Sequence, residues 1–472
     1  MKLDKNTILL LFLLIGIGWF MINRVSHVTR SIPVDDGWSP PVSVASTENG
    51  VAGGGGLYKW HDTLILIQSR YDWSSKSSTC SIIVRNNEPS NSWTQLPISG
   101  VPGDCAFYSP ALDQANDRIM FERGYIESNR LQMGAIFLRL TANNRIQVEA
   151  ERTWTMDQES LLGRTSTNVT LNEPAARTDR PNRDYPSLGV GILEGSKAYV
   201  AFSINAHTLF KTPVNYGGKT YMTGGVSDGP FYNGVFHSTD LGKTWQMEKI
   251  SDLDAGEPEM CRTKDYYYNF GMTGGGIRFS LKSVDGGSWS EPKFLTRTFT
   301  NRRGGGAVAE SDTVHVCWLD DRHEIKYWLS LARSGRGNYE VAYCRRKDSD
   351  SSWRKDIILS RGVMFAYSPS MSVEGDKIVV AWAGAQTAHA WPFEGDPSDI
   401  YYATSKDGGK TWKKPLKVTD RFKDGITSGS ARVALQNGVI HLFYAQGKWD
   451  NDTQVNHQGG WPVYYQQRPS PD

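Results

Sequence analysis

The sequence predicts an all-β chain built from repeated four-stranded units, and three observations lead to this. Aromatic residues make up 11% of the 472 residues, including 16 Trp and 21 Tyr, a composition rich in strand-forming side chains. A short turn motif ending in Trp recurs along the chain. Upstream of most copies, a short strand of small residues, a polar turn and a strongly apolar strand also recur.

The turn motif has the sequence STDLGKTW at Ser238–Trp245 and SKDGGKTW at Ser405–Trp412. A contracted copy, SVDGGSW, spans Ser283–Trp289. Ser and Asp side chains cap nearby backbone N–H groups, and Gly accepts the positive φ at which the chain reverses. Because strand-like sequence stands on both sides of each copy, the motif is predicted to form the corner of a β-hairpin.

The acidic residues of this motif are predicted to be structural, because copies spread around a repeat array cannot all reach one ligand. Asp240, Asp285 and Asp407 are each expected to cap their own turn, and the Trp is expected to pack back over its own hairpin. Degenerate copies end at Trp353 and at Trp93.

The recurring strand pair is clearest in four segments, at 186–206, 305–321, 369–385 and 430–447. Small residues on the first strand suit the crowded axis of a radial array. Four strands per unit, repeated around an axis, form a β-propeller. The predicted fold is therefore a β-propeller.

The two ends of the chain predict how the ring closes. The last unit ends with WPVYYQQR at 461–468, one strand short, while DGWSPPVSV at 36–44 has the sequence of a strand that follows a turn motif. The N-terminal strand is therefore predicted to complete the C-terminal blade. Seven blades are favoured, and six is the alternative if the weakest unit, Asp104–Trp154, is not a blade. The units are centred near Ile65, Ile119, Val200, Phe279, Val316, Val380 and the closing strands.

The S-x-D-x-G-x-x-W hairpin resembles the Asp box, or BNR repeat, of the sialidase-like superfamily, and the resemblance covers about residues 36–468. In that family the Asp boxes lie on the face away from the active site, and they also occur in non-hydrolytic proteins. Retaining sialidases clamp a substrate carboxylate with three Arg, use Tyr assisted by Glu as the nucleophile, and use Asp as acid/base. Their first-arginine signature, an aromatic followed by R-I-P, has its nearest equivalent here in TRSIPV at Arg30, with an additional Ser.

A functional site is predicted on the face that carries the long loops between the second and third strands of each unit and the entries into the first strands. These segments bring Arg, carboxylate and Tyr together, which the sequence does nowhere else. The catalytic candidates are Asp184, Tyr185, Glu259, Asp321 and Tyr367. The substrate-binding candidates are Arg183, Arg303, Arg322, Arg432, Trp328 and Trp391.

The family resemblance implies roles for some of these residues. Arg303 and Arg432 would hold an anionic group of the substrate. Asp184 or Asp321 would protonate the leaving oxygen, and Tyr185 or Tyr367 with Glu259 would form the nucleophilic side, assignments that follow from the sialidase pattern.

The N-terminus predicts export. An uncharged run of sixteen residues, Thr7–Ile22, follows MKLDKN, and its length lies between that of a signal-peptide core and a membrane-spanning helix. Residues 1–30 are therefore expected to be a signal anchor or a cleaved signal peptide with a short stalk, and residues 31–472 a single propeller. The propeller is predicted to be extracytoplasmic, either anchored to the membrane or secreted.

The remaining composition limits the partners. A net charge of +2 without a long basic run predicts no nucleic-acid partner. The five cysteines show no C-x-x-C spacing, so neither zinc nor another cofactor is expected, and disulfide pairing is left open. Two functions stay open: a sialidase-like glycoside hydrolase acting on a glycan, and a non-catalytic propeller that binds glycan or protein. Only the first needs a matched acid and nucleophile.

Overall fold

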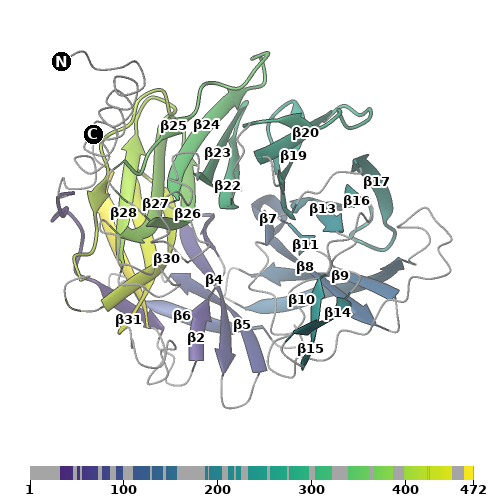
Figure 1. Cartoon of the computed structure of the whole chain (residues 1–472), viewed down its shortest axis with the longest axis horizontal. Coiled ribbons are helices and arrows are strands. Elements are labelled where there is room, and N and C mark those ends of the chain that lie inside the picture. Colours follow the sequence, from purple (N-terminus) through teal and green to yellow (C-terminus); the bar gives the residue numbers. More distant parts are fainter. Residues whose placement is uncertain are drawn as a thin grey trace, which may run out of the picture.

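The computed structural model is a ring of seven four-stranded antiparallel blades (Figure 1), which confirms the predicted propeller and its blade number. The structure describes residues 32–470 apart from short gaps and from 99–109, 157–186, 205–210, 225–231, 297–302, 321–338, 386–397 and 449–461. Within each blade the strands are named a to d in the order of the sheet. Strands a of neighbouring blades contact one another, so these strands line the centre of the ring.

The first three blades contain short or divided inner strands. Blade 1 contains β2 (Gly50–Gly53) and β3 (Leu57–Trp60) as strand a, then β4 (Thr63–Asp72), β5 (Ser77–Arg85) and β6 (Trp93–Pro97). Blade 2 contains β7 (Ala111–Asp113), the 3-10 turn η2 (Gln114–Asn116), β8 (Arg118–Glu127), β9 (Arg130–Leu140) and β10 (Ile146–Met156). Blade 3 contains β11 (Ser187–Leu188) and β12 (Ile192–Glu194) as strand a, then β13 (Lys197–Ile204), β16 (Tyr232–Ser238) and β17 (Gln246–Ser251).

The other four blades have continuous inner strands. Blade 4 contains β18 (Gly256–Arg262), β19 (Tyr266–Thr273), β20 (Gly276–Ser283) and β21 (Lys293–Phe294). Blade 5 contains β22 (Arg303–Glu310), β23 (Thr313–Asp320), β24 (Glu340–Lys347) and β25 (Ile357–Ile358). Blade 6 contains β26 (Phe365–Glu374), β27 (Lys377–Ala385), β28 (Asp399–Ser405) and β29 (Leu416–Lys417). Blade 7 contains β30 (Ile426–Gln436), β31 (Val439–Lys448), β32 (Val463–Pro469) and β1 (Val42–Ala45).

The ring closes as predicted, by a strand from the N-terminal part of the chain. β1 runs antiparallel to β32, with Val42 opposite Tyr465 and Ser43 opposite Tyr464. The purple strands of blade 1 lie next to the yellow strands of blade 7 in Figure 1. Residues 111–156 form a complete blade 2, so the weakest repeat of the sequence is a blade of its own. A further hairpin, β14 (Lys211–Tyr216) with β15 (Lys219–Gly224), lies within the segment joining strands b and c of blade 3.

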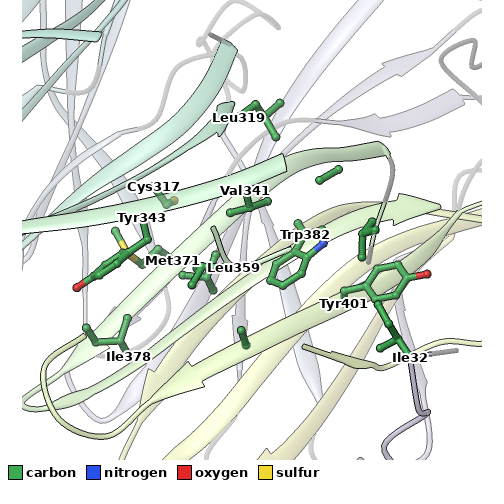
Figure 2. Close-up of a cluster of buried hydrophobic side chains, with 14 of the residues drawn as sticks. Ile32, Cys317, Leu319, Val341, Tyr343, Leu359, Met371, Ile378, Trp382 and Tyr401 are labelled. Atoms are coloured by element: carbon green, nitrogen blue, oxygen red, sulfur yellow. The ribbon is translucent and has the colours of Figure 1, made fainter. Parts of the chain in front are cut away.

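The core lies between blades, because each blade is too thin to bury its own side chains. Figure 2 shows the cluster between blades 5 and 6, where Leu319 and Val341 from one blade pack with Trp382 and Tyr401 from the other. Val341, Trp382 and Tyr401 are at most 1% exposed. Neighbouring pairs of blades contribute comparable clusters, which accounts for the strongly apolar strands b and c of the sequence.

The Trp of the turn motif packs on the preceding blade, so the expectation that it covers its own hairpin was wrong. Five of these Trp face aromatic side chains of the neighbour, and Nε1 of Trp289 donates a hydrogen bond of 2.8 Å to Glu248 of blade 3. The repeated turn therefore joins blade to blade. The ring pairs, with centroid separations, are Trp38 with Tyr402 (5.4 Å), Trp93 with Phe443 (4.8 Å), Trp245 with Trp154 (4.2 Å), Trp353 with Phe279 (5.3 Å) and Trp412 with Tyr343 (4.7 Å).

The N-terminal apolar segment, Thr7–Ile22, lies outside the described residues. In the part of the chain that is described, no helix has the length and apolar character needed to cross a membrane. Cys261, Cys317 and Cys344 are buried thiols outside any disulfide, whereas Cys80 is disulfide-bonded.

Candidate functional site

The ring has a turn end and a mouth end, which differ in the connections that the strands make there. At the turn end, strand a passes to strand b through a tight turn, and the Asp-box corners join strands c and d. At the mouth end, strand a begins and strand b leads into the loop toward strand c. The predicted site lies at the mouth end.

The inner strands are irregular toward the mouth end in six of the seven blades. In blades 4 to 7 the pairing of strands a and b shifts register, which marks a β-bulge, and in blades 1 and 3 strand a is divided in two. The shifts fall between Gly256 and Glu259, Arg303 and Gly305, Tyr367 and Ser370, and Gly429 and Arg432. Bulges redirect side chains and concentrate near active sites, so this level of the ring is the candidate site.

Two of these bulges hold a non-glycine residue in the left-handed region. Ser368 has φ 50° and Ser430 has φ 53°, each inside the bulge of its inner strand. Such a conformation costs energy for a residue with a Cβ and persists only where the surrounding structure imposes it. Blades 6 and 7 thus repeat the same local backbone distortion side by side.

Glu259 is the predicted catalytic carboxylate that the structure describes best. Its side chain is half-buried, and Oε1 accepts a hydrogen bond of 2.8 Å from the backbone N–H of Ala307 in the next blade. A bulge in β18 places it there, so its position is set by two inner strands at once. The carboxylate is held in place against the centre of the ring.

Arg432 lies at the end of the bulge in β30. Its Nη1 donates a hydrogen bond of 2.8 Å to the carbonyl of Ala431, and burial lowers the pKa of the guanidinium from its ordinary value. An arginine keeps its charge under such conditions, and a partly buried cation favours an anionic ligand nearby. The anion-binding role of Arg432 stays a prediction.

Tyr367 has its hydroxyl occupied within the contact of blades 6 and 7. The hydroxyl is hydrogen-bonded to Ser398 and lies 3.5 Å from the carbonyl oxygen of Ser428. Its ring packs against the hydrophobic clusters on both sides of blade 6. The nucleophilic role of Tyr367 stays a prediction, and the geometry described here is that of a blade contact.

The other predicted residues are only partly covered by the structure. Arg303 opens β22 opposite Leu319, with no description of its side chain. The remaining candidates lie outside the described residues: Arg183, Asp184, Tyr185, Asp321, Arg322, Trp328 and Trp391.

One buried acid was missed by the sequence analysis. Glu122 in β8 is 1% exposed and faces Gly191 of blade 3. Among the described residues, neither of its carboxylate oxygens has a partner within hydrogen-bond geometry. Burial raises its pKa well above the ordinary value, which favours the neutral form of the acid. The signal was present in RIMFERGY, where Glu122 interrupts the apolar residues of a strand.

The expectation that Arg, carboxylate and Tyr meet only at the mouth was wrong. Three such groups join blades elsewhere: Tyr267 with Glu194 and Arg262, Tyr268 with Asp348 and Arg346, and Tyr402 with Asp35 and Arg468. Burial raises the pKa of all three tyrosines, which keeps the phenols neutral and argues against nucleophilic roles. Residue types alone could not separate these groups from a catalytic one.

The complete Asp boxes cap their own turns as predicted. Asp407 Oδ1 accepts the backbone N–H of Thr411 at 2.9 Å, Oδ2 accepts the hydroxyl of Thr411 at 2.5 Å, and Asp240 binds Thr244 in the same way at 2.9 and 2.7 Å. For Asp240, the hydrogen bonds from Thr244 lower the pKa to about 2. For Asp285 the prediction was wrong: in the contracted copy no equivalent Thr exists, and Ser283 accepts the N–H of Asp285 at 3.3 Å in place of a carboxylate cap.

No cluster of three or more His, Cys, Asp or Glu suited to a metal occurs among the described residues. No family model and no curated protein matches the chain.

Among solved structures, the chain is similar to several glycoside hydrolases. The NanB sialidase of Streptococcus pneumoniae is 9% identical over 92% of this chain and 71% of that one, with a TM-score of 0.41. The Trypanosoma rangeli sialidase is 8% identical over 89% of this chain and 55% of its own length, with a TM-score of 0.40. The GH62 alpha-L-arabinofuranosidase of Coprinopsis cinerea is 9% identical over 63% and 94%, with a TM-score of 0.31. At these values the likeness concerns the fold only.

Proposed function

We propose that the protein is an exported, sialidase-like glycoside hydrolase that acts on a glycan at the mouth end of the propeller. The observation that carries the proposal is the concentration of bulges in the inner strands at that end, with Glu259 and Arg432 placed by two of them. A carboxylate fixed by a backbone N–H and a cation that favours an anionic ligand are groups that sialidase chemistry requires.

The proposed roles follow from what each described group can do. Arg432, with Arg303, would hold an anionic substituent of the sugar, and Glu259 would assist a tyrosine nucleophile. Because the hydroxyl of Tyr367 is taken up between Ser398 and Ser428, Tyr185 is the better candidate for that nucleophile. Asp184 or Asp321 would donate the proton to the leaving oxygen.

Export is supported by two features. The apolar segment Thr7–Ile22 has the position and composition of a signal peptide or signal anchor. The disulfide at Cys80 suits an oxidising compartment, because cytosolic proteins rarely keep structural disulfides. We therefore propose an extracytoplasmic propeller, anchored to the membrane or secreted.

Turnover of a panel of aryl glycosides, including a sialoside and an arabinofuranoside, tests the proposal with the full-length chain in mild detergent. Glu259→Gln and Arg432→Lys are expected to lower kcat/KM at least a hundredfold while thermal unfolding stays within a few degrees of wild type. Glu194→Gln, which changes a carboxylate of the same kind at the turn end, is the matched control and should retain activity.

The second candidate is a non-catalytic propeller that binds glycan with the same end. The hydrogen bond from Ala307 to Glu259 favours it, because a carboxylate that joins two inner strands serves the fold without any reaction. Absence of turnover on every glycoside, together with saturable glycan binding that Arg432→Lys weakens, would favour this candidate over the hydrolase.

A further inference from the structure

A pocket of about 380 Å³ lies at the turn end between blades 5 and 6, away from the mouth end. Four cationic side chains line it, contributed by β24, by the segment after it, and by the Asp box of blade 6. They are Arg345, Arg354, Lys355 and Lys410, and they lie beside Tyr343 and Gly409. The volume is that of a small-ligand site and exceeds what a bare ion needs.

Three of the four cationic side chains of this pocket have no ion pair among the described residues. Arg354 is bound by the carboxylate of Asp350, at 2.9 Å and 3.2 Å. Within the described part of the chain, no carboxylate pairs with Arg345, Lys355 or Lys410. Cations gathered in one concavity repel one another, so an anion that enters it gains from all of them.

The corresponding junction between blades 2 and 3 shows how the same position is neutralised elsewhere. Gly242 of the blade 3 Asp box lies against Phe137, just as Gly409 lies against Tyr343. Two residues after Phe137 comes Arg139, in the place of Arg345, and its Nη2 lies 3.3 Å from Oε1 of Glu149.

Glu149 also binds Arg118, with Nε at 2.6 Å from Oε2, so this junction carries an internal counter-ion on strand d. After β24 the chain instead supplies Arg354 and Lys355. The two junctions share the contact between the Asp-box glycine and an aromatic side chain. Of the two, only the junction between blades 5 and 6 lacks a carboxylate for its arginine on strand c among the described residues.

We propose that this pocket binds a tetrahedral oxyanion, the sulfate or phosphate ester of an anionic glycan. Arginine forks pair bidentately with such groups, and the two lysines add charge at the rim. The pocket has room for a sugar ring that carries the ester. A single concave site in a chain of net charge +2 is unlike the extended basic stripe that nucleic acid requires. The site is separate from the proposed catalytic end and does not depend on it.

The test is isothermal titration calorimetry of the full-length chain at low salt, with a sulfated tetrasaccharide, its unsulfated counterpart, sodium sulfate and sodium phosphate as the four probes. We expect the sulfated tetrasaccharide to bind and its unsulfated counterpart not to bind. The free ions should bind at least tenfold more weakly than the sulfated sugar. Affinity should fall as salt is raised, because exposed charges are screened.

The double variant Lys355→Gln, Lys410→Gln is expected to weaken binding of the sulfated tetrasaccharide at least tenfold. Both side chains are exposed, so folding should be unchanged in a thermal melt, and Arg345→Gln provides an independent variant. The matched control is Lys243→Gln, which changes the lysine at the same Asp-box position in blade 3 and should bind as wild type does.

Three results would overturn the proposal. Wild type and the double variant could bind the sulfated tetrasaccharide equally, the sulfated and unsulfated sugars could bind alike, or the wild type could fail to bind any probe at low salt. Equal affinity for free sulfate and the sulfated sugar would overturn the assignment to a glycan, because the ion alone would then account for the site.

Discussion

The turn end and the mouth end of the same seven inner strands are built in different ways. At the turn end, a hydrogen bond or ion pair links every blade to the next, and the links close into a ring. Blade by blade, the links are His61 to Gln114, Gly195 to Asp113, Arg262 to Glu194, Lys264 to Ser311, Gly375 to Glu310, Gly438 to Glu374, and Gln436 to His61.

At the mouth end the inner strands contain bulges, in contrast to the closed ring of links between blades at the turn end. Register shifts in four inner strands and positive φ at Ser368 and Ser430 break the regular ladder there. Regular pairing stabilises, whereas irregular backbone orients side chains at a cost in stability. The closed turn end therefore holds the ring together, so that the mouth end is free to carry a site.

The largest expected effect comes from Gly189→Ala, at the divided inner strand of blade 3. A Cβ there would overlap the carbonyl oxygen of Pro258 in blade 4, and backbone cannot move aside as a side chain can. We expect a loss of about 3 kcal/mol or more in the free energy of unfolding, the upper range for overpacking. Because Pro258 precedes Glu259, glycan turnover or binding at the mouth should fall as well.

Gly306→Ala is the control for that substitution. A Cβ at Gly306 would lie 3.8 Å from Oε1 of Glu259, an ordinary contact, and its φ is not in the left-handed region. Chemical denaturation should show a change within about 0.5 kcal/mol. Equal effects of the two substitutions would mean that close backbone approach between blades 3 and 4 does not position the inner strands.

The second effect is a pH dependence that arises near the turn end of blades 5 and 7. Burial, and then the charge of Arg345, lowers the pKa of His315 to about 4; burial, and then Arg85, lowers the pKa of His441 to about 3. Both rings lie against a tyrosine hydroxyl, at 2.7 and 2.8 Å.

For each histidine the folded state holds the neutral ring, so the unfolded chain binds more protons between pH 6.5 and the lowered pKa. The contribution of each neutral histidine to the free energy of unfolding is therefore fully present above pH 6.5 and falls as the pH is lowered through that window. At ~1.4 kcal/mol per pH unit, each histidine should contribute a loss of about 2 kcal/mol between pH 7 and pH 5. Urea unfolding at pH 5, 6 and 7 measures it, and His441→Asn should flatten the slope by about the share of one histidine. An unchanged slope would contradict this account.

Much of this architecture could be predicted from sequence, because repeated local signals specify it. The Asp-box turns, the apolar strands b and c and the incomplete last unit led to seven blades and to the N-terminal strand that completes blade 7. The sequence did not predict that each Trp packs on the preceding blade. A turn motif shows which residues cap it, but not which neighbouring blade receives its side chain.

The candidate site could be predicted only in part. The sequence indicated Glu259 and Arg432 as candidates because they stand at strand entries, and their roles stay predictions. The bulges that place them could not be predicted from the sequence, because the shift in pairing depends on the neighbouring strand. Glu122 was missed because a single acidic residue in an apolar strand belongs to no motif that would indicate a site. The Tyr, carboxylate and Arg groups between blades show that three residue types in proximity do not define a site.

An intermediate effect is expected for Glu374→Ala, which opens the ring of links between blades 6 and 7. Its carboxylate accepts the backbone N–H groups of Asn437 and Gly438, both at 2.8 Å. Burial acts to raise its pKa, but these bonds and Lys59 outweigh burial, and the net pKa is lowered. Hydrogen bonds to a charged group contribute about 2 kcal/mol, so a loss of that size is expected in chemical denaturation.

Glu310→Ala is the matched variant in the neighbouring link. There the carboxylate accepts a single, longer bond of 3.4 Å from Gly375, so the expected loss is below about 1 kcal/mol. Glycan binding at the mouth should be unchanged in both. If Glu374→Ala were no more destabilising than Glu310→Ala, the ring would not be what holds the turn end.

The smallest effect separates complete from contracted Asp boxes at the turn end. Asp407 caps the turn through Thr411, whereas the carboxylate of Asp285 has no hydrogen bond or ion pair among the described residues. Asp407→Ala should therefore lower the free energy of unfolding by about 1 kcal/mol, typical of a lost cap, and Asp285→Ala should leave it nearly unchanged.

Burial acts to raise the pKa of Asp407, but the hydrogen bonds from Thr411 outweigh burial and lower the pKa to about 2. The cap is thus fully effective above pH 3.8 and is lost as the pH falls toward 2, so the difference between wild type and Asp407→Ala should shrink over that window. Thermal unfolding at pH 7 and pH 3 measures this, with glycan binding at pH 7 expected to be unchanged in both variants, and equal melting of the two variants at pH 7 would contradict it.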